Sequence, residues 1–142
     1  MKNVKKNNKG FSLVELIVVV MIMAIIAAAL APQVMKWVNN SRIATDVSNY
    51  DSLVANCQLA LTDSDAYKES KAATDAKRLT ITISSTGTSF IDSNDHDSID
   101  EQLDSLDPSW TTLKPQVSGN TYKIEIYDGT VHKTTAPSDT ME

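Results

Sequence analysis

A single acidic residue, Glu15, interrupts the longest apolar stretch of the chain. Between Phe11 and Ala31, every residue except Ser12 and Glu15 is apolar. If this stretch lies in a membrane, an ionised carboxylate within it costs about 2.5–3.5 kcal/mol on insertion scales, and such residues usually have a partner or a function. Two explanations are open at this point: Glu15 reaches the interface, stabilised by the positive end of the helix dipole, or it pairs with a specific cation.

The apolar run has the length of a transmembrane helix, because at 1.5 Å per residue it spans a bilayer core of about 30 Å. Lys2, Lys5, Lys6 and Lys9 precede it, with no acidic residue among the first ten. The positive-inside rule keeps these lysines in the cytoplasm and places the C-terminal part outside. An ordinary secretory signal would end in an Ala-x-Ala site, which only Ala27-Ala28-Ala29 approximates. We therefore predict a single-pass anchor in the cytoplasmic membrane.

The sequence Gly10-Phe11-Ser12-Leu13-Val14-Glu15, between the basic leader and the apolar run, resembles the class III signal of type IV prepilins and pseudopilins. In that family a membrane-embedded aspartic peptidase cuts after the glycine and methylates the new amino group. The resemblance implies a cut between Gly10 and Phe11, with N-methylated Phe11 as the first residue of the mature chain. Gly10 has no Cβ to obstruct the close approach of a protease.

The resemblance also implies a partner for Glu15 and a role for Pro32. In the family, the carboxylate at this position pairs with the N-terminal ammonium of a neighbouring subunit, which sets the register between subunits. Either charge alone is costly in an apolar bundle. A proline at this place occurs in many pilins, where the preceding stretch loses helicity during assembly. The chain departs from that pattern at Ala24, where a glycine is frequent, and alanine holds a helix better by about 1 kcal/mol.

Beyond Pro32 the apolar residues recur at alternating spacings of four and three, which is typical of one buried stripe on a helix. The stripe consists of Ile43, Val47, Tyr50, Val54, Cys57 and Leu61, and the polar residues next to its members include Arg42, Asp46, Asn49 and Asp51. Cys57 on this stripe is expected to act as a small buried apolar residue. Trp37 is either an interfacial anchor or a contact between subunits.

The remainder predicts an antiparallel sheet. Residues 79–84 alternate as a half-buried strand, a turn is expected at 86–89, and a second strand is expected to begin at Phe90. Residues 121–127 alternate again, and Asp128-Gly129 is a strong hairpin signal. We predict an α+β, pilin-like fold, in which a long N-terminal helix with a membrane-spanning half and an amphipathic half packs on a small antiparallel sheet.

We expect the chain to be organised in five consecutive segments. It comprises a cleaved basic leader (1–10), a transmembrane and filament-core helix half (11–31), an amphipathic helix half (32–61), a globular head with the sheet (62–135) and a loose tail (136–142).

An acidic segment offers candidate calcium ligands, because oxygen-bearing side chains are closely spaced at Asp92, Asn94, Asp95 and Asp97. The segment lacks the glycine and the distal bidentate glutamate of an EF-hand, and Leu103 falls where that acid would lie. Ser98 and Glu101 instead predict a capping box that opens a short helix. A solvated acidic loop and helix is therefore favoured, and no cofactor is expected.

No catalytic constellation is visible in the sequence, since it has no phosphate loop or nucleophile elbow and His96 and His132 are far apart. Loss of the four leader lysines lowers the net charge from −5 to −9, which argues against nucleic acid as a specific partner. We predict a non-enzymatic subunit of an extracellular type IV pilus. The alternatives are a pseudopilin of type II secretion or competence DNA uptake, and a membrane-anchored binding module.

The expected partners are further copies of the chain in a helical homopolymer, prepilin peptidase, the pilus assembly platform, and membrane lipid before assembly. The expected location is the cytoplasmic membrane, with the head outside, and then the cell-surface pilus. Adhesion and motility are functions that such a pilus serves.

Overall fold

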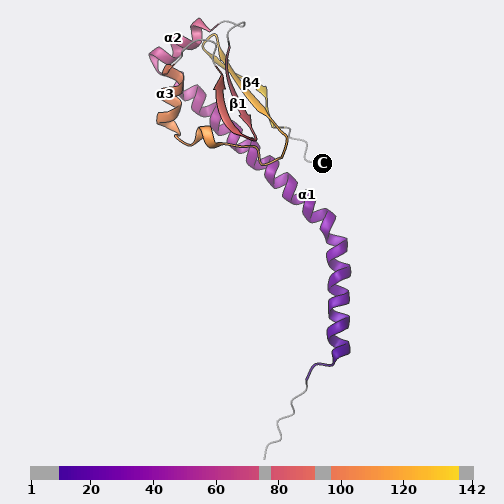
Figure 1. Cartoon of the computed structure of the whole chain (residues 1–142). Coiled ribbons are helices and arrows are strands. Elements are labelled where there is room, and N and C mark those ends of the chain that lie inside the picture. The colour runs from indigo at the N-terminus through magenta and orange to yellow at the C-terminus, as the bar shows by residue number, and fades with distance from the viewer. Residues whose placement is uncertain (1–9, 74–77, 92–96, 138–142) are drawn as a thin grey trace, which may run out of the picture. The chain divides into compact units, whose positions relative to one another are not determined.

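The structure is a computed structural model that describes residues 10–73, 78–91 and 97–137. It contains helices α1 (Leu13–Ala60), α2 (Ser64–Ala72) and α3 (Asp97–Leu106), the 3-10 turn η1 (Trp110–Thr112), and strands β1 (Leu79–Ser84), β2 (Gly87–Ile91), β3 (Tyr122–Tyr127) and β4 (Thr130–Thr135) (Figure 1). The chain divides into two compact units, Met1–Val38 and Asn39–Glu142, each described by itself below.

Helix α1 is continuous over 48 residues and includes Pro32. A proline inside a helix lacks an N–H and leaves the carbonyl four residues earlier, here that of Ala28, without its helical partner. The alanine-rich stretch before Pro32 has high intrinsic helix propensity, which favours the helix on this side of the proline. The predicted membrane-spanning and amphipathic halves thus occur in one helix.

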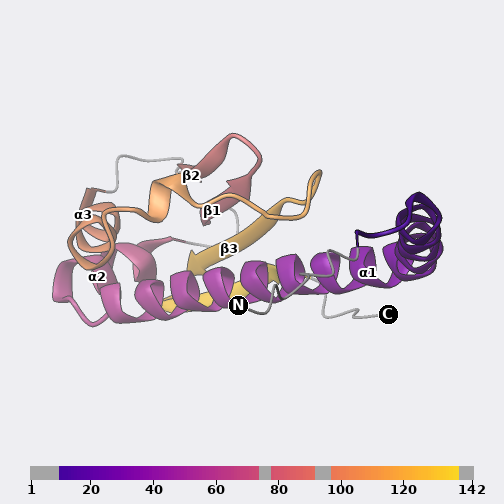
Figure 2. The same ribbon diagram turned by 90° about the horizontal axis from the view of Figure 1, so that it is seen from below.

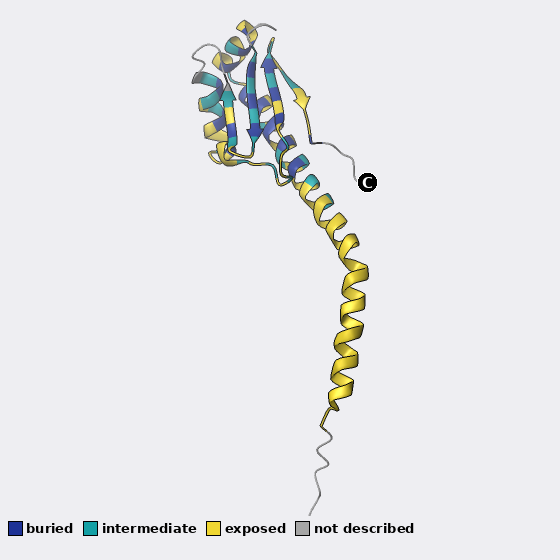
Figure 3. Cartoon of the chain, turned by 45° about the vertical axis from the view of Figure 1, so that its right-hand side comes forward, coloured by how far each residue is buried: buried dark blue, intermediate teal, exposed yellow. Residues whose placement is uncertain are grey.

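The N-terminal unit exposes its apolar side chains. Every described residue from 10 to 38 is exposed (Figure 3), and large apolar side chains such as Leu13, Met23, Ile25 and Met35 each expose more than half of their area. A contiguous apolar surface of this kind marks a membrane or protein contact. This segment therefore requires cover from outside its own chain.

In the second unit, four antiparallel strands form a sheet in the order β2-β1-β3-β4. Ile81 of β1 lies opposite Phe90 of β2 on one side and Ile124 of β3 on the other. The C-terminal part of α1 runs along one face of this sheet (Figure 2). The core between them is formed by Tyr50, Leu53, Val54, Cys57 and Ala60 of α1 and by Leu79, Ile81, Ile83, Tyr122, Ile124 and Ile126 of the sheet. The predicted α+β architecture is confirmed.

Strand β2 differs from the prediction, because it begins at Gly87 rather than at Phe90. The turn that joins it to β1 is Ser85-Thr86, and Ser84 already pairs with Gly87. Gly87 has a φ of 132°, which suits glycine at the first residue after the turn. The Thr88 hydroxyl donates a hydrogen bond to the carbonyl of Leu113 at 3.0 Å. The first residues of β2 have no apolar alternation, and this contact with a segment distant in the sequence helps to hold them in the strand.

The predicted Asp128-Gly129 hairpin is confirmed. Both residues have positive φ, 50° and 72°, as a type I′ turn requires. The turn packs closely against Tyr67 of α2. A residue with a side chain would clash at position 129, because its Cβ would lie only 2.8 Å from the Tyr67 ring. The Lys71 ammonium hydrogen-bonds the Asp128 carboxylate and holds its pKa below the usual range.

The predicted capping box of α3 is wrong. Helix α3 already includes Asp97, so Ser98 lies inside the helix, and its N–H donates to the Glu69 carboxylate of α2 at 3.2 Å. The start of α3 is thus capped by another helix, which no local pattern encodes. Leu103, at the position where an EF-hand would carry its glutamate, is fully buried.

Asp46 is a buried carboxylate that joins α1 to the segment before β3. It is 3% exposed and accepts hydrogen bonds from the N–H groups of Gln116 and Val117, at 2.6 and 3.2 Å, and from the Tyr122 hydroxyl at 3.0 Å. Burial raises the pKa of Tyr122, so its hydroxyl remains a donor. Asn120 in turn donates to the same hydroxyl at 3.1 Å. We call this arrangement the Asp46 clamp.

Replacement of Asp46 by alanine is expected to destabilise the second unit by about 3 kcal/mol, because buried donors lose their acceptor at about 1–3 kcal/mol each. Urea unfolding of a fragment comprising residues 39–142 measures this change. Asp51→Ala is the matched control on the same helix. Asp51 is half exposed in its pair with Lys133, so the control should change stability by about 1 kcal/mol or less. Equal effects of the two substitutions would contradict the clamp.

Candidate processing and assembly site

The first turn of α1 is closed by a reciprocal capping box. The Ser12 hydroxyl oxygen accepts a hydrogen bond from the Val14 N–H at 3.3 Å, and the Glu15 carboxylate accepts one from the Ser12 N–H at 2.8 Å. The Ser12 carbonyl accepts from the Leu16 N–H at 3.2 Å, which begins the helical pattern. Two donors that a helix start leaves unpaired are thereby satisfied.

This box is not among the features predicted above, although its signal is present in the sequence. Ser12-Leu13-Val14-Glu15 is a Ser-x-x-Glu pattern directly before an apolar run. The explanations considered for Glu15 were the dipole of its own helix and a cation outside the chain. The structure shows that Glu15 also has a partner within it, and that its negative charge lies at the positive end of the helix dipole.

The Gly10–Phe11 peptide bond precedes the helix. Gly10, Phe11 and Ser12 are not helical, and Gly10 and Phe11 are exposed, Phe11 by 93%. A Cβ placed on Gly10 would meet no other atom within 4 Å. This bond therefore lies in accessible backbone, as cleavage by a protease requires.

A family model described as "Prokaryotic N-terminal methylation motif" matches residues 5–31. The chain carries this motif. It is the class III signal of type IV pilins and pseudopilins, and it implies processing by prepilin peptidase. The methylation motif and the apolar helix fit a membrane-anchored precursor that becomes part of a surface pilus.

The matched segment includes Gly10, Phe11 and Glu15 but ends at Ala31, one residue before Pro32. The motif describes a processed structural segment and not an enzyme family. No curated protein and no solved structure matches the chain.

The other candidate residues do not converge on this site. Pro32 lies inside α1 and is separated from Glu15 by about 25 Å of helix. Cys57 is fully buried in the core, as expected, and Trp37 is 66% exposed in the N-terminal unit. Trp110 is buried and its indole N–H donates to Asp104 at 2.7 Å.

The predicted calcium ligands Asp92, Asn94 and Asp95 lie outside the described residues, and Asp97 is the first residue of α3. Among the residues that the structure describes, no group of three or more His, Cys, Asp or Glu side chains could hold a metal ion.

Gly10→Val is expected to block processing without disturbing the chain, since a side chain at this position has free space. Immunoblots of membranes from cells that express prepilin peptidase should show the uncut precursor only, with at least about a tenfold loss of the mature form, the equivalent of 1.4 kcal/mol. Asn8→Val, in the leader, is the matched control. Normal maturation of Gly10→Val would place the cut elsewhere.

Proposed function

We propose that this chain is the structural subunit of an extracellular type IV pilus filament, assembled through its N-terminal helix. The observation that carries this proposal is the combination of a methylation motif with a capped Glu15 at the start of an exposed apolar helix. A stalk that served only as an anchor has no use for a carboxylate within its apolar run.

The first step is cleavage by prepilin peptidase between Gly10 and Phe11. Hydrolysis of this bond leaves a carboxylate on Gly10 of the leader and an amino group on Phe11, which is then methylated. The four leader lysines depart with residues 1–10. The mature chain then begins with a positive amino group one residue before Ser12, while Ser12 retains the N–H that Glu15 binds.

The second step is the pairing of Glu15 with the Phe11 ammonium of a neighbouring copy. One hydrogen bond, from Ser12, occupies the Glu15 carboxylate within the chain. An ionised carboxylate has about four acceptor sites, so it retains capacity for an ammonium. The new ammonium and the helix dipole are both positive at this end of α1, and Glu15 is the only negative charge among residues 10–38.

Register between copies is expected to come from this charge pair rather than from apolar contact. The N-terminal unit is surrounded by lipid before assembly and by other helices afterwards, and both surroundings are apolar. Transfer of this unit from lipid to the helix bundle therefore changes its hydrophobic free energy only slightly. An unpaired ammonium or carboxylate in the bundle is strongly disfavoured, which selects arrangements that bring Phe11 and Glu15 together.

In this proposal the segments have the roles expected from the sequence. Residues 11–31 first span the membrane and then form the filament core, residues 32–61 carry the head, and the acidic head formed by residues 62–135 faces outward. The partners are further copies of the chain, prepilin peptidase, the assembly platform of the cytoplasmic membrane, and lipid before extraction.

Mass spectrometry of filaments sheared from the producing cells is the experiment that tests this function. We expect this chain to dominate the preparation and to begin at N-methylated Phe11. A chain that begins at Phe11 but remains in the membrane fraction would instead be a pseudopilin, which shares the methylation motif, or a minor subunit. A chain that keeps its leader in every fraction would contradict processing altogether.

Glu15→Gln separates the charge of this residue from its role as a cap, because an amide oxygen still accepts the Ser12 N–H. Filament yield should fall at least about tenfold in both Glu15→Gln and Glu15→Ala, with unchanged amounts of precursor in the membrane. Ser12→Ala is the control: it removes the hydroxyl cap at about 1 kcal/mol but keeps the charge, so filaments should persist. Normal assembly of Glu15→Gln would show that the charge is dispensable.

A further inference from the structure

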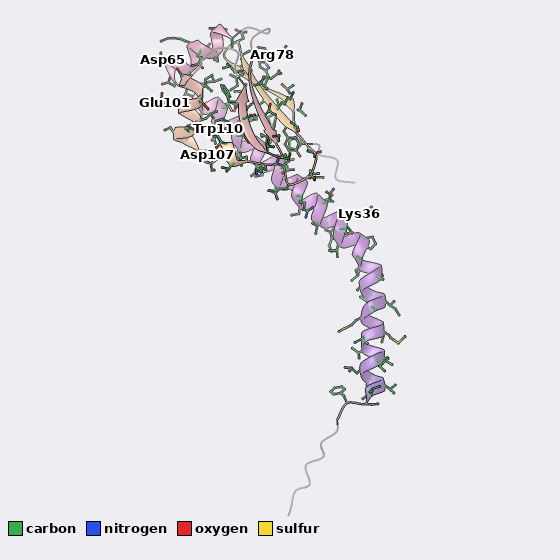
Figure 4. The ribbon with its side chains drawn as sticks, viewed as in Figure 1. Lys36, Asp65, Arg78, Glu101, Asp107 and Trp110 are labelled. Atoms are coloured by element: carbon green, nitrogen blue, oxygen red, sulfur yellow. The ribbon has the colours of Figure 1, made fainter. Side chains whose placement is uncertain are left out.

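Lys36 is the only basic residue among residues 10–38 of the N-terminal unit. Its exposed side chain projects from α1 (Figure 4) and forms no ion pair or hydrogen bond with any described residue. In the second unit, by contrast, four basic residues have a carboxylate partner within the chain: Lys68 with Asp65, Lys71 with Asp128, Arg78 with Glu125 and Lys133 with Asp51. The described chain thus offers Lys36 no anion of its own.

The surroundings of Lys36 on the helix are apolar. Two residues on each side of it are large, apolar and exposed: Val34, Met35, Trp37 and Val38. A lysine in such a place lays its alkyl stem along the apolar surface and extends its ammonium into polar surroundings. Trp37, which is 66% exposed, suits the same boundary, because an indole has an apolar body and one N–H donor. The polar sequence Asn39-Asn40-Ser41 follows directly, so the apolar surface ends at this point.

The position of Lys36 along α1 matches the thickness of a bilayer. Glu15 and Lys36 belong to one continuous helix and are separated by about 32 Å of it, whereas the hydrocarbon core of a bilayer is about 30 Å thick. Helix α1 is long and apolar enough to cross a membrane. When Glu15 lies at the cytoplasmic surface, Lys36 and Trp37 therefore reach the outer headgroups. The two charged residues of this stretch then lie at the two surfaces of the bilayer and not in its core.

We propose that Lys36 and Trp37 bind the headgroup of an anionic phospholipid in the outer leaflet while the chain resides in the membrane. We call these two residues the outer anchor. The inference rests on the proposed pilus function, because it concerns the stage before a subunit enters the filament. The Lys36 ammonium pairs with the lipid phosphate, and the Trp37 ring packs against the acyl chains beneath it. Anionic lipid is the occupant because it supplies a negative charge and an apolar surface at one depth, which a soluble anion does not.

The outer anchor sets how deeply α1 lies in the bilayer. A helix whose apolar stretch exceeds the thickness of the core tilts or shifts, and interfacial Trp and Lys residues decide its position. Residues 13–38 extend over about 38 Å of helix, so such a choice exists here. With Lys36 held at the outer surface, the Gly10–Phe11 bond, which precedes α1, stays at the opposite surface and accessible to processing.

The test measures quenching of Trp37 fluorescence by lipids that carry bromine on their acyl chains. The full chain is reconstituted in mixed vesicles of phosphatidylcholine and phosphatidylglycerol, and only one of the two lipids is brominated in each preparation. The ratio of the two quenching efficiencies reports which lipid is preferred around Trp37. Trp110 is 2% exposed in the core of the second unit and gives a constant background, which the Trp37→Phe variant measures.

We expect phosphatidylglycerol to be preferred about two- to fivefold around Trp37 of the wild type, as one lysine at an anionic surface allows. Lys36→Gln should abolish the preference, whereas Lys36→Arg keeps the charge and should retain it. Lys68→Gln is the matched control, because it removes an exposed lysine whose partner lies in its own chain. No preference in the wild type, or an unchanged preference in Lys36→Gln, would overturn the proposal.

The depth of Trp37 is checked in the same vesicles. Bromine close to the headgroup should quench Trp37 more strongly than bromine at the end of the acyl chain. The reverse order would place Trp37 inside the hydrocarbon core and contradict the outer anchor.

Filament yield distinguishes a carboxylate of a second copy as the partner of Lys36. If Lys36→Gln lowers the yield of sheared filaments but leaves the lipid preference unchanged, that carboxylate is the partner and the proposal is wrong. Failure of the pilus function itself has a separate signature, because the wild type would then be missing from the sheared fraction. The vesicle measurement requires no assembly, so its outcome is independent of that failure.

Discussion

The apolar surface of the first part of α1 is the constraint on which the rest of the molecule depends. Residues 10–38 are all exposed and form no core of their own. Water is an unfavourable surrounding for such a helix, whereas lipid, or a bundle of identical helices in the proposed filament, would cover it. The methylation motif lies at the start of this helix, and the proposed cut between Gly10 and Phe11 precedes α1 and leaves its apolar surface intact.

The second unit is a head that is built on the remaining turns of the same helix and has its own core. Tyr50, Leu53 and Cys57 pack against the central strands β1 and β3, and the Asp46 clamp fastens the segment before β3 to α1. Because the helix supplies one layer of the core, the sheet needs only four strands. The head is thereby covalently continuous with the helix that the proposed assembly uses.

Much of the architecture could be predicted from sequence patterns alone. Alternation in residues 79–84 and the Asp128-Gly129 pair each depend on a few adjacent residues, and both are confirmed. Strand β2 and the start of α3 were predicted less well, because their partners are remote: Thr88 binds the Leu113 carbonyl and Ser98 binds Glu69. The Ser12–Glu15 box was missed although its pattern is local.

The sequence by itself determined the apolar helix, the position of the methylation motif, the strand at 79–84 and the Asp128-Gly129 hairpin, since these follow from composition and short-range spacing. Only the tertiary structure decided the role of Asp46 and the distribution of unpaired charge. Asp46 follows the spacing of a polar surface residue, yet its carboxylate is buried by donors about seventy residues away in the chain. Which charges find a partner depends on distances between side chains, and those distances exist only once the chain has folded.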